Sequence, residues 1–137
     1  MPAEQSTESF DENVSRFYAL WEQIAAHYRA YPPEVYFDIL NEPNKALGAA
    51  RWNELLAKAL KIIRKSNPER TVLVGTPNLG QSWTIGLLEL PRDEWNVIVE
   101  IHCYTPATFT HQGASWVPGS RAWRGTKWTG ARGEGSH

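Results

Sequence analysis

The stretch YFDILNEPN, residues 36–44, decides the fold and raises the main question about function. Four of its first five residues are bulky and suit a buried strand, and Asn41, Glu42 and Pro43 follow directly. A carboxylate is costly to bury unless it has partners or unless an altered pKa is its purpose. The end of this strand is therefore the first place to look for chemistry.

The composition is that of one globular domain. Of the 137 residues, 42% are hydrophobic and 21% are charged, which leaves enough apolar material for a core. The 14 basic and 15 acidic residues give a net charge of −1, which argues against nucleic acid or an anionic membrane as a partner. No apolar run approaches the roughly 20 residues that cross a bilayer. We expect a single domain over residues 1–137, with poorly ordered ends at residues 1–8 and 130–137.

Three apolar stretches predict strands, and helical patterns separate them. The expected strands are Val35–Leu40, Thr71–Gly75 and Val97–His102. Apolar residues at spacings of three and four predict helices from Ser9 to about Ala30 and from Trp52 to Ile63. Short strands that are apolar on both faces are typical of a parallel sheet covered by helices, so the fold class is α/β.

Polar and aromatic residues follow each expected strand. In parallel α/β folds, functional groups lie at the carboxyl ends of strands. Here those ends carry Asn41 and Glu42, then the segment from Pro77 to Trp83, and then His102 and the residues that follow it. We expect one shared site at this edge. Beyond Tyr104 the sequence is rich in Gly, Trp and Arg without a clear period, and we expect a loop.

Two of these segments resemble glycoside hydrolase family 5, the cellulase-type retaining glycosidases with (β/α)8 TIM barrels. YFDILNEPN is similar to the fourth strand of that barrel, and HCYTPATFTHQGASW, residues 102–116, is similar to the sixth strand and its loop. The resemblance runs from about Ser9 to Trp128. It implies a partial TIM barrel, the central fragment of a catalytic domain, with about three parallel strands that correspond to strands four to six.

The resemblance implies that Glu42 is the general acid/base. Such a group donates a proton to the leaving oxygen and later activates water, so its pKa must be raised by partial burial and a second carboxylate. Asn41 would bind the sugar 2-hydroxyl, a contact that strengthens in the transition state. The alternative for Glu42 is a carboxylate that stabilises the start of the next helix.

His102 and Tyr104 are two residues apart on the expected strand, so they face the same side. The resemblance places both in the cleft, with Tyr104 near the nucleophile and His102 binding sugar. The alternative is a hydrogen-bonded core histidine and a packing tyrosine. Cys103 points the other way, and we expect it to be small, buried and without chemistry.

Aromatic residues are frequent, with 7 Trp, 5 Tyr and 4 Phe. A core of this size cannot hide all the tryptophans, and exposed rings suit sugar binding because pyranose faces stack on them. Trp83 and Trp116 are the candidates for such substrate-binding platforms, and packing is the alternative for each. The histidines lack the spacing of metal ligands and Cys103 is alone, so we expect no metal and no cofactor.

A retaining glycosidase needs a second carboxylate about 5 Å from the first, and the sequence offers no obvious one. Asp38 lies about 13 Å from Glu42 along the strand. Glu100 lies on the His102 face, two residues deeper, where we expect it to contact a neighbour in the site or a structural partner. The family's nucleophile follows a seventh strand, which has no counterpart after Trp128, and Glu134 in the Gly-rich tail is a poor match.

The sequence therefore supports two hypotheses. In the first, the chain is a fragment of a β-1,4-glucan-cleaving endoglucanase, with β-mannan or another β-glycan as the other possible substrate, and is weakly active or inactive alone. In the second, it is a non-catalytic fold fragment or carbohydrate-binding scaffold that self-associates through exposed strand edges. The first residues are polar and acidic, unlike a secretory signal, and the compartment stays open although full-length relatives are commonly secreted.

Overall fold

The computed structural model describes residues 7–43 and 47–130. Their contacts divide the chain into two compact units, one ending at His102 and one beginning at Cys103, and each is described by itself. The expected disorder at residues 1–8 and 130–137, together with Glu134, falls almost wholly outside the described residues. Among the described residues, no helix is both long and apolar enough to cross a membrane.

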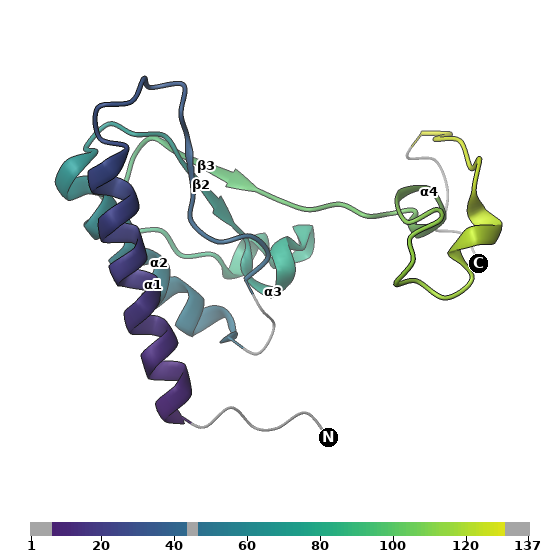
Figure 1. The fold of residues 1–137 in the computed structure, drawn as a ribbon, viewed down its shortest axis with the longest axis horizontal. Coiled ribbons are helices and arrows are strands. Elements are labelled where there is room, and N and C mark those ends of the chain that lie inside the picture. Colours follow the sequence, from purple (N-terminus) through teal and green to yellow (C-terminus); the bar gives the residue numbers. More distant parts are fainter. Residues whose placement is uncertain (1–6, 44–46, 131–137) are drawn as a thin grey trace. The chain divides into compact units, whose positions relative to one another are not determined.

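The first unit is a three-stranded parallel sheet with helices (Figure 1). The strand order is β1-β2-β3, and Val72 of the central strand pairs with Phe37 on one side and Val97 on the other. The elements of this unit are α1 (Thr7–His27), β1 (Phe37–Asp38), α2 (Ala49–Ser66), β2 (Val72–Gly75), α3 (Pro77–Gly80), η2 (Ser82–Leu87) and β3 (Val97–Glu100). The expected parallel order of the three strands is confirmed.

The core lies between the sheet and the two long helices, which pack side by side in Figure 1. Trp52 of α2 is fully buried, and its indole N–H donates to the carbonyl of Gly75 at 3.0 Å. Trp21 of α1 donates in the same way to the carbonyl of Ile39 at 3.2 Å. Burial of large apolar side chains drives this packing, and the two indole bonds fix the helices against the strand ends. The other buried hydrophobic residues of the core are Ala25, Phe37, Ile39, Leu55, Leu56, Ala59, Leu60, Ile62, Ile63, Val72 and Val74.

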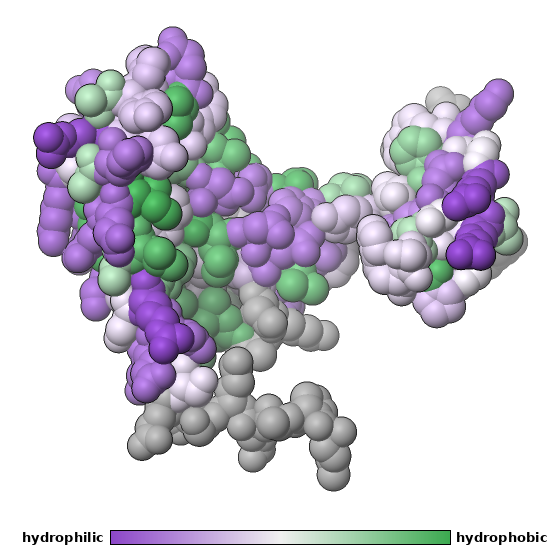
Figure 2. Space-filling view, viewed as in Figure 1, coloured by the Kyte–Doolittle hydropathy of each residue, from purple (hydrophilic) through white to green (hydrophobic). Residues whose placement is uncertain are grey.

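The opposite face of the sheet is largely uncovered. Asp38, Leu73 and Ile98 pair in register and so share this face. Asp38 is exposed, and the Ile98 side chain is 47% exposed. Figure 2 shows hydrophobic residues at the surface of this unit among hydrophilic ones. An apolar strand face that meets solvent is an incomplete core.

The strands are shorter than their apolar runs. The expected strand Val35–Leu40 contains only β1, whose ladder is limited by its single neighbour, with Phe37 N bonded to Thr71 O and Ile39 N to Leu73 O. The expected strand that ends at His102 stops at Glu100. Strand length here depends on backbone partners, which the apolar pattern does not encode.

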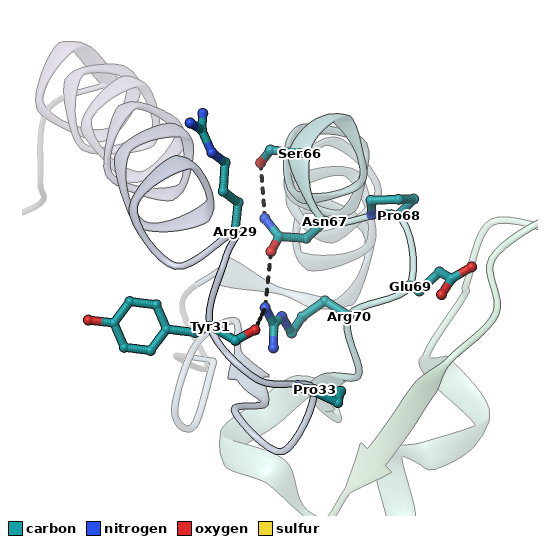
Figure 3. Close-up of a pocket in the computed structure, with 8 residues that line it drawn as sticks. All are labelled: Arg29, Tyr31, Pro33, Ser66, Asn67, Pro68, Glu69 and Arg70. Carbon is teal, nitrogen blue, oxygen red and sulfur yellow. Dashed lines mark hydrogen bonds between the residues drawn. The ribbon is translucent and has the colours of Figure 1, made fainter.

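A buried arginine closes the end of the sheet where the strands begin. Arg70 is 7% exposed, and its guanidinium donates to four carbonyls of the segment that joins α1 to β1, those of Tyr28, Tyr31, Pro32 and Val35. Asn67, at the end of α2, donates to Ala25 O at 2.7 Å and lies beside Arg70 (Figure 3). Tyr31, Asn67 and Arg70 also line a hollow at this end of the sheet. The hollow is a structural junction, because the terminal guanidinium nitrogens are already occupied by the backbone.

The second unit contains two short helices, α4 (Ala107–Thr110) and η3 (Ser120–Trp123), where we expected only loop. Four residues are too few for an apolar period to show in the sequence. Gln112 connects the unit, because its amide donates to Phe109 O and Thr126 O and accepts from Gly125 N. Ser120 is the buried residue of this unit among residues 103–130. Polar bonds to the backbone, more than apolar burial, hold the unit together.

Candidate functional site

Glu42 lies just beyond β1, at the carboxyl end of the sheet. Its φ of 47° is in the left-handed region, which is uncommon for a residue with a side chain and marks a position held by its surroundings. The next residue, Pro43, is buried, and its carbonyl accepts a 2.9 Å hydrogen bond from Leu79 N. The segment after β2 thus fixes the backbone that carries Glu42.

His102 lies just beyond β3 and is held by the same segment. Its backbone N–H donates to the carbonyl of Gly80 at 2.8 Å. His102 thereby forms an isolated parallel β-bridge with Gln81. A Cβ on Gly80 would lie 3.2 Å from the imidazole ring, and the φ of Gly80 is +71°. Gly80 therefore permits a close approach that other residues would obstruct.

The two side chains meet. His102 Nδ1 lies 2.8 Å from Glu42 Oε1, and the side chains are 22% and 29% exposed. The hydrogen bond with Glu42 raises the pKa of His102, burial opposes the rise, and the charges of Glu42 and Glu100 add to it. The structure therefore favours an imidazolium that donates to the Glu42 carboxylate.

Glu100, the last residue of β3, lies on the other side of the ring. Its Oε1 is 3.6 Å from His102 Nε2, and this buried oxygen has no hydrogen-bond partner among the described residues. A Cβ on Gly75 would lie 3.8 Å from the same oxygen and 3.3 Å from Pro43 Cδ. The glycine at the end of β2 thus leaves room for both neighbouring strand ends.

The alternative for Glu42, a carboxylate that stabilises the start of the next helix, finds no support at α2, the next helix whose bounds lie within the described residues. Helix α2 begins at Ala49 with Gly48 before it, and its first turn contains no acidic residue. The contact of Glu42 is with His102, which comes from a different strand. The described residues contain no group of three His, Cys, Asp or Glu placed to hold a metal ion.

The other residues predicted for the site lie in different places. Asn41 is exposed beside Glu42 in the chain, and Trp83 lies on η2 with 76% of its surface exposed. Tyr104 and Trp116 belong to the second unit and are 45% and 76% exposed. Neither tryptophan is a core residue of its unit, so both rings are open to a ligand. Their roles in substrate binding stay predictions.

One expectation about the segment after β3 is wrong. Cys103 is exposed, where we expected a buried residue, because β3 ends at Glu100 and Cys103 lies beyond the paired part of the strand. That His102 and Tyr104 face the same side stays a prediction, because the two residues belong to different units. Within the second unit, the Tyr104 ring contacts His111, with ring centroids 5.2 Å apart and the ring planes inclined by 57°.

The sequence identified Glu42 and His102 but not how they are connected. The residues that bring them together are Gly75 and Gly80, which leave space for neighbouring groups. A glycine at the end of a strand is the available signal, since it often marks a close backbone approach. Because side chains alternate between the two faces of a strand, the sequence already predicts that Glu100 and His102 lie on the same face.

The family model "Cellulase (glycosyl hydrolase family 5)" matches residues 1–133. The chain belongs to glycosyl hydrolase family 5. It is 38% identical over 107 residues to Cellodextrinase A of Ruminococcus flavefaciens, covering 78% of this chain and 32% of that protein. Endoglucanase H of Acetivibrio thermocellus is 33% identical over 119 residues, covering 87% of this chain and 12% of that protein.

The family 5 chain is also similar to solved structures. Endoglucanase Cel5A of the hyperthermophile Thermotoga maritima matches with 49% identity and a TM-score of 0.76, covering 85% of this chain and 38% of the other. The same enzyme in complex with mannotriose matches with 44% identity and a TM-score of 0.78, covering 95% and 42%. The chain thus spans less than half of the proteins it resembles. Its three strands and helices match part of the TIM barrel of those endoglucanases, and its sheet is not closed.

The raised pKa of His102 makes the contribution of the Glu42–His102 pair to stability depend on pH. Because the folded-state pKa lies above the ordinary value of 6.5, this contribution is complete below that pH and is lost as the pH rises through the folded-state pKa. We expect the free energy of unfolding, measured with urea, to fall across this window. Glu42→Gln should remove much of the fall. Glu22→Gln, which changes an exposed carboxylate of α1, should leave it unchanged, and an equally steep fall in both variants would point to another group.

Proposed function

We propose that this family 5 chain provides the acid/base part of a retaining glycosidase site for β-1,4-linked glucan, with Glu42 as the general acid/base. The observation that carries the proposal is the Glu42 carboxylate at the carboxyl end of the sheet, in hydrogen-bond contact with His102. Catalytic groups of TIM barrels come from this end of the strands. Glu42 would protonate the leaving oxygen and then take a proton from water.

The neighbours of Glu42 support this assignment. The contact at 2.8 Å holds Oε1 of Glu42 against His102, and a carboxyl group that is held in place is suited to exchange a proton with a glycosidic oxygen. Asn41 is exposed next to Glu42, where its amide could bind the 2-hydroxyl of the sugar. We propose Trp83 and Trp116 as rings on which sugar units stack.

A β-glycan is the substrate class that the relatives support. Their names are cellodextrinase and endoglucanase, and Thermotoga maritima Cel5A has been solved with cellobiose and with mannotriose. We propose glucan as the main substrate and β-mannan as the second candidate.

The nucleophile is the missing part of this site. A retaining mechanism requires a carboxylate about 5 Å from Glu42. Glu100 is the carboxylate that the described residues place beside His102, and the imidazole stands between it and Glu42. We therefore propose that the nucleophile lies outside the described residues and that cleavage by this chain alone is very weak.

A second candidate function is a non-catalytic scaffold that self-associates and binds carbohydrate. It is favoured by the open sheet, in which β1 and β3 are the edge strands. Ile98 and Val99 of β3 and the following Ile101 are 47%, 37% and 48% exposed. Exposed apolar edge strands pair with other strands, and we propose that a second copy of the chain covers the exposed edge at β3.

The first prediction of the proposal concerns cleavage. Where cleavage is measurable, in the chain alone or in a reconstituted barrel, Glu42→Gln should abolish the release of reducing ends from soluble cellulose while the far-ultraviolet circular dichroism stays that of the parent, because an amide cannot give up or accept the proton. Glu22→Gln should keep the activity of the parent. A folded Glu42→Gln variant that cleaves at the parental rate would end the assignment.

The second prediction concerns carbohydrate binding. Trp116→Ala should weaken binding of cello-oligosaccharides by about 1 kcal/mol or more, measured by calorimetric titration, because a stacking ring is lost. Its stability should change little, since the ring is 76% exposed. Trp95→Ala is the matched control, because Trp95 is 58% exposed but precedes β3, at the other end of the strand. Equal loss of affinity in both variants would contradict a specific role for Trp116.

The third prediction concerns assembly. Light scattering at micromolar concentration should show dimers or larger species, because an isolated sheet with open apolar edges is marginally stable. Ile98→Lys should shift the distribution toward monomer, since it adds a charge to the exposed face. A parent chain that is monomeric and unfolds cooperatively under these conditions would refute self-association.

A further inference from the structure

Glu100 is a titratable group at the carboxyl end of the sheet that the proposed acid/base chemistry does not use. It ends β3, its side chain is 20% exposed, and its Oε1 is buried without a hydrogen bond. A buried carboxylate oxygen normally has a donor, because losing water without replacing it is unfavourable. The group that faces this oxygen is His102, whose Nε2 lies 3.6 Å away.

The imidazole of His102 therefore lies between two carboxylates, one at each ring nitrogen. Nδ1 faces Glu42 at 2.8 Å and Nε2 faces Glu100 at 3.6 Å. A neutral imidazole has one N–H, whereas the imidazolium has two and can donate to both sides. This arrangement suits a ring that carries a proton on each nitrogen.

The backbone around the ring keeps this geometry. The main-chain bond from His102 to Gly80 sets where the side chain starts, and the ring lies against Gly80 without a side chain between them. Gly75 leaves space for the Glu100 carboxylate at the end of β2. The charges of Glu42 and Glu100 both act on the ring, and Gly80, which lies against it, carries no charged side chain.

We propose that Glu100 is a positioning residue, which holds the His102 ring as an imidazolium with Nε2–H toward Glu100, so that Nδ1–H remains a fixed donor to Glu42. Through this donor, Glu100 sets the orientation of the acid/base carboxylate without contacting the substrate. This inference rests on the proposed function for its meaning in catalysis. The contact itself exists in the folded chain whether or not cleavage occurs.

The test is a histidine titration of the isotope-labelled chain, without substrate, by proton–nitrogen correlation spectra of the imidazole rings. His102→Gln assigns the signals by their disappearance. In Glu100→Gln, which keeps the shape of the side chain and removes its charge, we expect the pKa of His102 to shift downward and its side-chain rotamers to average. Glu22→Gln is the matched control and should leave both unchanged.

A folded Glu100→Gln variant with the parental His102 pKa and a single parental rotamer would overturn the proposal. If that variant does not fold, Glu100→Asp gives the same answer, because the shorter side chain withdraws the carboxylate from Nε2 and should also lower the pKa of His102. An unchanged pKa in the aspartate variant would equally refute it. A folded Glu42→Gln variant that cleaves at the parental rate would end the proposed function and leave this result standing.

Discussion

Parallel pairing around β2 is the constraint on which the rest of the structure depends. Because Val72 pairs in the same direction with Phe37 and Val97, all three strands end at one edge of the sheet. Glu42 and His102, which are 60 residues apart in the chain, meet only for this reason. An antiparallel β3 would place His102 at the opposite edge, where Arg70 lies.

Backbone spacing, more than side-chain size, sets the geometry at this edge. Gly75 ends the central strand and lies within contact distance of Pro43 and Glu100. Gly80 receives the main-chain bond of His102 and lies against its ring. These two glycines therefore leave space where a side chain would stand, and charged groups from the outer strands approach each other there.

The two ends of the sheet have different roles. Where the strands begin, the guanidinium of Arg70 donates hydrogen bonds to the segment between α1 and β1. The charged group at this end of the sheet therefore stabilises the fold. Where the strands end, Glu42, Glu100 and His102 remain partly exposed, and their charges interact with one another. This division is the one expected of a TIM barrel, in which one end stabilises and the other carries the chemistry. In this chain it persists although the sheet is not closed.

The sequence by itself determined the order of helices and strands, the parallel α/β class and the family, because apolar periodicity and a motif such as NEPN are local properties. It also placed Glu42 and His102 at strand ends. Tertiary structure alone decided where the strands stop, that Cys103 is exposed and that short helices follow it, since each depends on partners distant in the chain. It alone placed the imidazole between Glu42 and Glu100. That contact depends on the close approach that Gly75 and Gly80 permit, and spacing between distant strands is not written in any single stretch of sequence.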